Sequence, residues 1–353
     1  MMRLIKWLVF GLLLLIGFAF KEPLHSYPFP ELSFFPVMPR SGDNVVTIEG
    51  AELGRYLFYD STLSLNNNMS CGSCHKQAAA FSDAPNAFSQ GNNNHFTTRN
   101  TMPLFNLAWY PKLFWDGRAT SIEEQVFHPV RDSTEMNLPW KMAAKRIDKN
   151  AFYQKQFQRV FGNRKIDSVL IAKAIGQFLR TLISYQSKYD RVLAGKDRLT
   201  DDEYKGLVLV NDMTKGDCLH CHTTDANALG TTGGFSNNGL EAATDVSFYR
   251  DKGLGGTTQR MADYGKFKIP SLRNVAVTAP YMHDGRFNQL GQVLDFYSEG
   301  VKQAVNVDTK MGFAHQGGAR LNVLEKHQII LFLNTLTDSV FITNPAFANP
   351  FAR

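Results

Sequence analysis

All four cysteines of the 353-residue chain lie in two copies of one five-residue pattern. Residues 71–75 read CGSCH, and residues 218–222 read CLHCH. This pattern is the attachment signal of c-type haem, because two thiols one helical turn apart can each bond a vinyl group at one edge of the same porphyrin. The histidine that follows can then ligate the iron from one face. The sequence therefore predicts a chain that folds around two covalently bound haems.

Each predicted haem takes two thioether bonds and one imidazole ligand. The residues are Cys71, Cys74 and His75 for the first haem, and Cys218, Cys221 and His222 for the second. A zinc site would use paired thiolates at tetrahedral spacing, and a thiol–disulfide redox motif needs no trailing histidine. Disulfide pairing, for which four cysteines allow three arrangements, does not explain the two histidines either.

The first 22 residues predict export. Arg3 and Lys6 precede an apolar run over residues 7–20, which is typical of the basic and hydrophobic regions of a signal peptide. The sequence has no clear small-residue cleavage site, and the apolar run is short for a membrane span. We expect a signal peptide or an N-terminal anchor over 1–22, and hence a periplasmic protein. A buried core helix is the alternative.

The charge balance argues against a nucleic-acid partner. The net charge is +6 and 44% of the residues are hydrophobic, as in an ordinary globular protein. Lysine and arginine are not clustered or interleaved with aromatic residues, as a nucleic-acid-binding surface would require. A mildly basic surface of this kind could steer an acidic partner.

Hydrophobic spacing predicts a mainly α fold. Helices are expected over residues 48–59, 121–128, 140–161, 168–186, 290–299 and 322–336. Ser121 with Glu124 forms a capping-box pattern that marks a helix start, and the same pattern at Thr200 starts another helix. An extended arm is expected over 23–46 and irregular chain over 223–268, and no segment predicts a sheet.

Two segments downstream of the haem motifs resemble each other. Residues 99–118 read RNTMPLFNLAWYPKLFWDGR, and residues 273–286 read RNVAVTAPYMHDGR. Both begin with Arg-Asn and end with Asp-Gly-Arg, and Trp115 and His283 hold equivalent places before the aspartate. The repeat predicts a duplicated haem domain with a boundary near 187–200.

These motifs together resemble the bacterial dihaem cytochrome c peroxidase family, which includes the MauG-type enzymes that oxidise tryptophans of a partner protein. The resemblance rests on both haem motifs, on FWDGR with the following EEQ…P…EM, and on PYMHDGRF, and it spans roughly residues 48–338. It implies two cytochrome c-like haem domains packed against each other. The N-terminal peroxidatic domain would cover 23–190, and the C-terminal electron-transfer domain would cover 200–338.

The resemblance assigns the peroxide site to the first haem. Glu135, in DSTEM, matches the family's distal carboxylate, and a carboxylate there can move a proton between the two peroxide oxygens. Gln125 and Pro129 fall on matching pocket positions. Trp115 matches the tryptophan between the two haems, where an aromatic ring can bridge electron transfer. Without the resemblance, Glu135 would be interpreted as a solvated loop residue and Trp115 as a core residue.

A calcium ion between the haems is also implied. Its ligands would be the side chain of Asn100 and the backbone carbonyls of Thr278 and Pro280. Oxygen ligands from loops suit a hard cation. The alternative is that Asn100 is only a turn residue.

The sequence departs from the better-known peroxidases in two places. Those enzymes carry a histidine after the first motif that ligates the oxidised iron, whereas the loop here holds only His95, which lies too near Arg99 to align. We therefore expect the iron of the first haem always to have an open coordination position.

The second departure concerns the other iron. Where those peroxidases have a methionine ligand to the second iron, the chain has Tyr297, as in MauG-type enzymes, with Met311 and Met282 as alternatives. Ligation by Tyr297 would favour oxidised iron and a low potential.

Three functions follow as hypotheses. The first is a cytochrome-c peroxidase that reduces hydrogen peroxide to water with electrons from a small cytochrome c or a cupredoxin. The second is a MauG-type enzyme that oxidises side chains of a partner protein, and the third is a non-catalytic dihaem electron carrier or redox sensor. Family members are often dimers, so a homodimer is one expected assembly.

Overall fold

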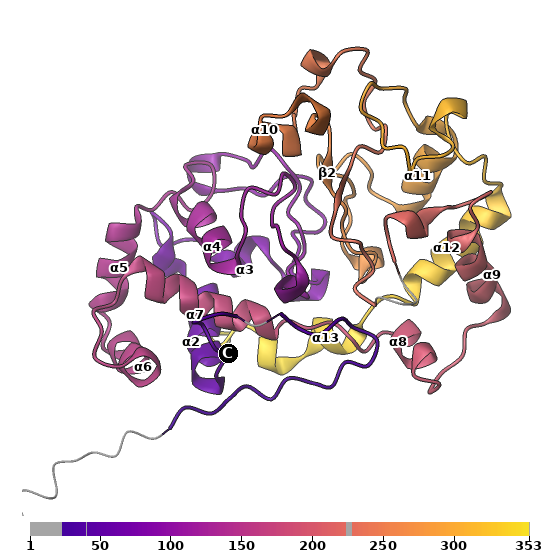
Figure 1. The fold of residues 1–353 in the computed structure, drawn as a ribbon. Helices are drawn as coiled ribbons and strands as arrows, with labels where there is room; N and C mark the ends of the chain where they lie inside the picture. The colour runs from indigo at the N-terminus through magenta and orange to yellow at the C-terminus, as the bar shows by residue number, and fades with distance from the viewer. Residues whose placement is uncertain (1–22, 40, 224–227, 353) are drawn as a thin grey trace, which may run out of the picture.

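The computed structural model describes residues 23–39, 41–223 and 228–352. The leader predicted over 1–22 lies outside these residues. The fold is mainly helical, as predicted, and forms two halves that pack side by side (Figure 1). Among the described residues, none of the helices has the length and hydropathy needed to cross a bilayer.

The helices of the N-terminal half enclose one large apolar cluster. They are α2 (Ile48–Tyr59), α3 (Cys71–Cys74), α4 (Ile122–Arg131), α5 (Trp140–Asp148), α6 (Ala151–Phe161) and α7 (Ser168–Thr181). The single helix predicted over 140–161 was wrong, because the side chain of Asn150 accepts a hydrogen bond from the N–H of Phe152 and starts α6 as a separate helix. The helix predicted over 168–186 ends earlier, at Thr181.

The C-terminal half has shorter elements and more irregular chain. Its helices are α8 (Lys188–Leu193), α9 (Asp201–Asn211), α10 (Leu254–Thr258), α11 (Leu290–Asp295) and α12 (Val323–Asn334). The last helix, α13 (Ser339–Thr343), packs on the N-terminal half. A π-helical turn, Phe296–Gly300, extends α11 over the predicted 290–299 segment. An antiparallel pair that the sequence did not predict joins β1 (Phe235–Ser236) to β2 (Phe267–Lys268).

The same helix crossing occurs in both halves. Helix α2 crosses α7 at Gly54, where a Cβ atom would lie 2.0 Å from the carbonyl oxygen of Ala174. Helix α9 crosses α12 at Gly206, where a Cβ atom would lie 2.0 Å from the carbonyl oxygen of Gln328. Glycine is therefore needed at both points, since any side chain would force the helices apart. The shared crossing supports a duplicated domain.

The sequence repeat is also a structural repeat, but its register differs from the prediction. Asn106 and Asn274 each adopt the left-handed conformation, with φ of 55° and 56°, and each starts a short 3₁₀ turn. The chain then forms a tight hairpin around Asp-Gly-Arg. An antiparallel bridge closes each hairpin, between Leu113 and Ala119 in the N-terminal half and between Tyr281 and Phe287 in the C-terminal half. The counterpart of Asn274 is therefore Asn106, and the predicted match to Asn100 was wrong.

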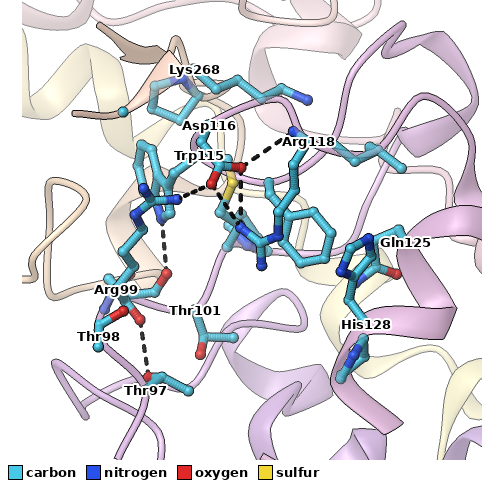
Figure 2. Close-up of a pocket in the computed structure, with 18 of the residues that line it drawn as sticks. Thr97, Thr98, Arg99, Thr101, Trp115, Asp116, Arg118, Gln125, His128 and Lys268 are labelled. Carbon is cyan, nitrogen blue, oxygen red and sulfur yellow. Dashed lines mark hydrogen bonds and ion pairs between the residues drawn. The ribbon is translucent and has the colours of Figure 1, made fainter. Parts of the chain in front are cut away.

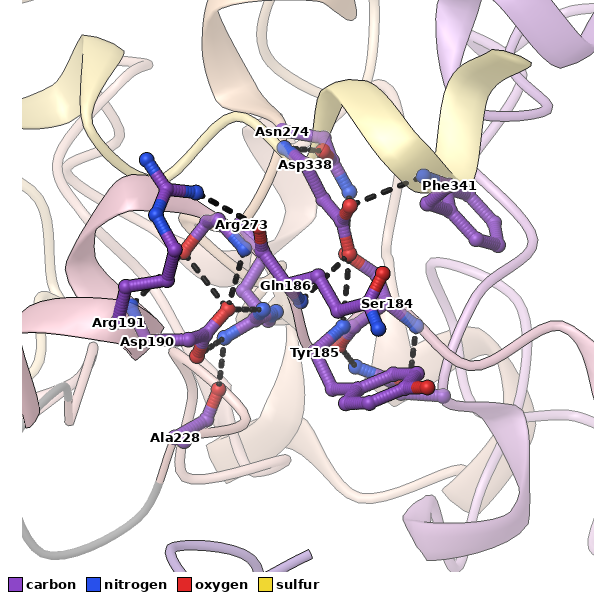
Figure 3. Close-up of polar contacts among 12 residues, drawn as sticks. Ser184, Tyr185, Gln186, Asp190, Arg191, Ala228, Arg273, Asn274, Asp338 and Phe341 are labelled. Atoms are coloured by element: carbon purple, nitrogen blue, oxygen red, sulfur yellow. Dashed lines mark hydrogen bonds and ion pairs between the residues drawn. The ribbon is translucent and has the colours of Figure 1, made fainter. Parts of the chain in front are cut away.

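The linker between the two halves, residues 182–187 between α7 and α8, is held by one buried carboxylate. Asp338, which is 1% exposed, accepts hydrogen bonds from the backbone N–H groups of Tyr185 (2.8 Å) and Gln186 (2.9 Å). Its carboxylate also accepts from the Ser184 hydroxyl (3.1 Å) and from the N–H of Phe341 (2.9 Å), as Figure 3 shows. One side chain thus ties the linker to the start of α13.

A buried ion pair forms a second anchor for the linker. Arg273 pairs with Asp190 of α8 through both terminal nitrogens and also donates to the carbonyl of Ala228 at 2.8 Å (Figure 3). The guanidinium lies over the ring of Phe35 in the N-terminal arm, 5.4 Å from its centroid. Polar contacts therefore join the linker helix, the arm and the C-terminal half.

Both ends of the described chain run across the boundary between the halves. After α12 the chain returns to the N-terminal half, where Phe341 and Phe347 join its apolar cluster. The extended arm passes under both halves (Figure 1). Its Phe34 carbonyl accepts from the N–H of Ala228 (3.0 Å), and its Pro36 carbonyl accepts from the indole N–H of Trp109 (2.8 Å).

Candidate active site

A cavity of about 1030 Å³ is lined by both halves (Figure 2). The N-terminal half contributes His75, the loop residues 97–105, the hairpin around Trp115 and one face of α4 with the loop that follows it. The C-terminal half contributes residues from 250–257 and 268–271. Such a volume is at the upper end of the range for cofactor and ligand pockets.

His75 has the geometry of a haem ligand. It follows α3 directly, and its Nδ1 atom lies 2.6 Å from the carbonyl oxygen of Phe81. Because a carbonyl can only accept, Nδ1 carries the proton and Nε2 keeps its lone pair. Burial lowers the pKa of His75, which keeps the ring neutral. A tight turn with left-handed Ala80 and Phe81 brings the carbonyl to the ring. The residues therefore fit a c-type haem in the cavity.

His222 repeats this arrangement in the C-terminal half. Its Nδ1 atom lies 2.9 Å from the carbonyl oxygen of Pro270, so Nε2 is again the free nitrogen. Burial lowers the pKa of His222 to about 4. Cys218 begins a short 3₁₀ turn that ends just before Cys221, so the two cysteines lie one turn apart directly before the histidine. The second motif therefore also fits a haem.

Glu135 lines the cavity from the loop between α4 and α5. Its backbone N–H donates to the carbonyl of Asp132, at the end of α4. Burial, with the nearby carboxylate of Asp132, raises the pKa of Glu135 to about 7, and the positive charge of Arg118 limits the rise. A carboxyl group with this pKa can both take up and release a proton near neutral pH.

Helix α4 presents Gln125, His128 and Pro129 to the same cavity, since positions three and four apart share one face. Figure 2 shows Gln125 and His128 together on this helix. The Ser121 hydroxyl caps its start by accepting from Glu124 N–H, as predicted. The Glu124 carboxylate binds Thr120 instead of Ser121, so only half of the predicted capping box forms.

Trp115 lies where the two halves meet. Its indole N–H donates to the carbonyl of Asn100 (2.8 Å), and its own carbonyl accepts from the N–H of Lys268 in β2 (2.8 Å). The indole ring meets the ring of His283 edge-on, with centroids 6.5 Å apart. His283 in turn stacks on Phe267 with centroids 3.6 Å apart. Trp115 is thus held by hydrogen bonds and ring contacts from both halves.

An ion-pair network that the sequence did not predict crosses the cavity wall. Arg99 binds Asp251 of the other half through two nitrogens, at 2.7 and 2.8 Å, and binds Asp116 at 2.6 Å. Asp116 also binds Arg118 at 3.0 Å, and Figure 2 shows the two arginines on either side of it. Burial alone would raise the pKa of Asp251, but Arg99 holds it below its usual value.

Lys268 is a second residue that the sequence did not single out. It is 4% exposed, and its Nζ atom donates to the carbonyl of Lys112 (2.6 Å) and lies 3.8 Å from the ring centroid of Tyr110. Burial lowers the pKa of Lys268 to about 7. In the sequence this lysine, in KFKIP, looks like a solvated one, because its burial depends on the packing of the two halves.

The candidate ligands of the second iron pack against one small apolar cluster in the C-terminal half. They are Tyr297, Met282 and Met311. The side-chain amide of Asn238 donates to the Tyr297 hydroxyl at 3.0 Å. Burial raises the pKa of Tyr297 to about 12, and the nearby thiols of Cys218 and Cys221 contribute to the rise. All three side chains therefore meet at one cluster, where Asn238 holds the hydroxyl of Tyr297.

The other predicted site residues occupy separate places. Asn100 directs its side-chain N–H groups to the carbonyls of Asn86 and Ala87, and its backbone N–H donates to the carbonyl of His283. Calcium binding by Asn100 with Thr278 and Pro280 stays a prediction. His95 is exposed and is not among the residues that line the cavity.

Comparison with known proteins gives a consistent result. The family described as "Di-haem cytochrome c peroxidase" matches residues 48–198. The methylamine utilization protein MauG of Methylophilus methylotrophus is 30% identical over 302 residues, covering 85% of each chain. Cytochrome c551 peroxidase of Nitrosomonas europaea is 32% identical over 310 residues, covering 86% of this chain and 84% of that one. The crystal structure of a MauG-like protein associated with microbial copper homeostasis has a TM-score of 0.83 and 30% identity, and the match covers 92% of this chain and 100% of that one.

Proposed function

The chain belongs to the di-haem cytochrome c peroxidase family, and we propose that it is a peroxidase that reduces hydrogen peroxide to water with electrons from a small cytochrome c. One observation carries this proposal. The cavity wall holds both the free Nε2 of a haem-binding histidine, His75, and a carboxyl group, Glu135, whose pKa is raised to about 7. An iron ligand and a proton carrier in one cavity are what peroxide reduction needs.

Glu135 handles the protons in this proposal. Reduction of one peroxide molecule consumes two electrons and two protons and yields two water molecules. The ionised carboxylate of Glu135 accepts a proton from one peroxide oxygen and returns it to the oxygen that leaves as water. Gln125, on the neighbouring face of α4, has an amide that can hydrogen-bond peroxide or water in the cavity.

Cys71, Cys74 and His75 would hold the first haem, and Cys218, Cys221 and His222 would hold the second. The haems, when bound, supply iron that binds peroxide and exchanges electrons. Trp115 contributes an aromatic ring at the junction of the two halves, held on one side by Asn100 and on the other by Lys268. We propose that the ring of Trp115 bridges electron transfer between the two haems.

The remaining details belong to the same proposal. We propose two domains, 23–190 and 200–338. The separate apolar clusters of the two halves support a division into two, with Tyr189 of α8 already in the C-terminal cluster. We also propose export to the periplasm and a calcium ion at Asn100. A cupredoxin is the alternative electron donor, and a homodimer is the proposed assembly. The second iron would take Tyr297 as its other ligand, as the resemblance to MauG-type enzymes implies.

A MauG-type reaction is the second candidate function. The observation that favours it is Tyr297, which packs with the other candidate ligands of the second iron and, by the resemblance, stands where MauG-type enzymes have a tyrosine. A phenolate ligand favours oxidised iron, and would suit an enzyme that draws electrons slowly from side chains of another protein. One relative with 30% identity is itself named MauG.

Steady-state turnover of the haem-loaded protein separates these functions. With reduced small cytochrome c and hydrogen peroxide, we expect sustained oxidation of the cytochrome, two molecules per peroxide, at tens of turnovers per second, or roughly the median for enzymes. Slow oxidation together with a long-lived oxidised state of the protein would favour the MauG-type function. A protein whose spectrum does not respond to peroxide would be an electron carrier or sensor, and the proposal would be wrong.

A further inference from the structure

The loop over residues 90–96 binds directly to the segment that carries Glu135. The backbone N–H of Asn92 donates to the carbonyl of Glu135 at 2.8 Å, and its side-chain amide donates to the carbonyl of Met136 at 2.7 Å. The same amide lies 3.5 Å from the sulfur of Met69. Asn92 is 1% exposed. One buried residue thus fixes two consecutive peptide units at the carboxylate.

Gly91 brings this loop into close contact with the same segment. A Cβ atom at this position would lie 1.9 Å from the carbonyl oxygen of Thr134 and 2.9 Å from the Cα atom of Glu135. Gly91 has a φ of −97°, which any residue can adopt, so glycine is needed here for space and not for its backbone freedom. The contact therefore depends on the missing side chain.

Backbone hydrogen bonds close the loop on itself. The N–H of Gly91 donates to the carbonyl of His95 (2.8 Å), the N–H of His95 donates to the carbonyl of Asn92 (3.2 Å), and Gln90 pairs with Phe96 in an antiparallel bridge. The loop therefore has a defined shape from which Asn92 reaches the neighbouring segment.

The side-chain amide of Asn92 is oriented by the Met136 carbonyl. Its Nδ2 atom donates to that carbonyl, and its Oδ1 atom is buried with no hydrogen-bond partner among the described residues. An apolar residue at the same place would lose the bond to the Met136 carbonyl. The amide N–H is therefore what links this side chain to the segment that carries Glu135.

We propose that Asn92, with the space left by Gly91, is a positioning residue that holds the carboxyl group of Glu135 in place over the cavity. The inference rests on the proposed peroxidase function. Proton transfer requires the carboxylate to lie within hydrogen-bond reach of peroxide, and a displacement of about 1 Å can cost roughly a hundredfold in rate. Residues 90–96 do not line the cavity, so we expect their effect on turnover to pass through Glu135.

The test is a double-mutant cycle on the haem-loaded protein. Asn92→Ala should lower kcat/KM for peroxide by roughly ten- to a hundredfold. In a Glu135→Gln background the same change should have little further effect, since its target is already lost. Equal losses in both backgrounds would show a general structural defect and overturn the inference, as would unchanged kcat/KM in Asn92→Ala.

A control and a second variant complete the experiment. Asn94→Gly changes an exposed residue of the same loop, whose φ of 61° glycine tolerates, and should leave kcat/KM unchanged. Gly91→Ala should reproduce the loss by pushing against Thr134, and it carries the test if Asn92→Ala does not accumulate. Hydrogen exchange should quicken across residues 132–137 in Asn92→Ala but not in Asn94→Gly; unchanged exchange would overturn the inference.

The two proposals fail in distinguishable ways. If Glu135→Gln abolishes turnover while Asn92→Ala and Gly91→Ala do not affect it, the positioning role is wrong and the proposed function stands. If Glu135→Gln itself retains full activity, the role given to Glu135 in the proposed function is wrong, and the positioning role fails with it.

Discussion

Peroxide turnover should fall by about a hundredfold or more when Glu135 is replaced by glutamine, since general acid–base groups contribute roughly 10²–10⁴ to rate. Glutamine keeps the shape and the hydrogen-bonding capacity of the side chain but cannot carry the proton. Both haems should remain attached, because Cys71 and Cys74 lie on a different element, α3. The measurement is kcat/KM for peroxide, with the haem content checked by the pyridine haemochrome spectrum.

Glu52→Gln is the matched control for this variant. Glu52 is an exposed carboxylate of α2 that does not line the cavity, so the same chemical change there should leave turnover unaltered. Retained activity in Glu135→Gln would remove this residue from the mechanism, whatever happens in the control.

The wild-type protein should also show the ionisation of Glu135 in its pH profile. Burial raises the pKa of Glu135 to about 7, and only the ionised carboxylate can accept a proton. Activity should therefore be low below pH 6, rise through about pH 7 and level off above it. The rise in activity through pH 7 should be absent from the residual activity of Glu135→Gln. A rise that persists in that variant would belong to another ionising group.

Replacing Asp338 by alanine should destabilise the folded protein by about 3–5 kcal/mol, because each buried donor left without its acceptor costs about 1–3 kcal/mol. The change leaves the N–H groups of Tyr185, Gln186 and Phe341 without their acceptor. It also removes the contact that ties the linker to α13. The midpoint of urea denaturation of the haem-loaded protein should fall accordingly.

Asp43→Ala provides the comparison for this variant. Asp43 also forms an ion pair, with Lys173 at 2.6 Å, but its side chain is 86% exposed. Exposed pairs contribute at most about 1 kcal/mol, so its midpoint should scarcely move. If Asp338→Ala were as mild as Asp43→Ala, the buried carboxylate would not be what fixes the linker.

Features set by neighbouring residues could be predicted from the sequence. The haem motifs are local, because the two thiols and the histidine follow one another along the chain. The helix starts at Ser121 and Thr200 also depend on residues three positions apart, and the structure places helix caps at both. In contrast, the break at Asn150 was missed because the apolar spacing of α5 continues into α6 and hides the cap between them.

Features that depend on the packing of the two halves could not be predicted. Arg99 and Asp251 are 152 residues apart, and neither has a neighbour along the chain that marks it as an ion-pair partner. The burial of Lys268 arises only when its strand meets the hairpin around Trp115. Likewise, the contact of Asn92 with Glu135 joins two loops whose sequences, rich in asparagine and in polar residues, look solvated.

The return of Phe341 and Phe347 to the N-terminal half has a consequence for how the protein is made. Domains generally fold as units, with the N-terminal one first when a chain emerges in order. Here the N-terminal half lacks two of its buried aromatic side chains until the last residues of the chain have reached it. The apolar cluster against which Cys71 and Cys74 pack is incomplete until then, so we expect haem attachment to precede the final packing of that half.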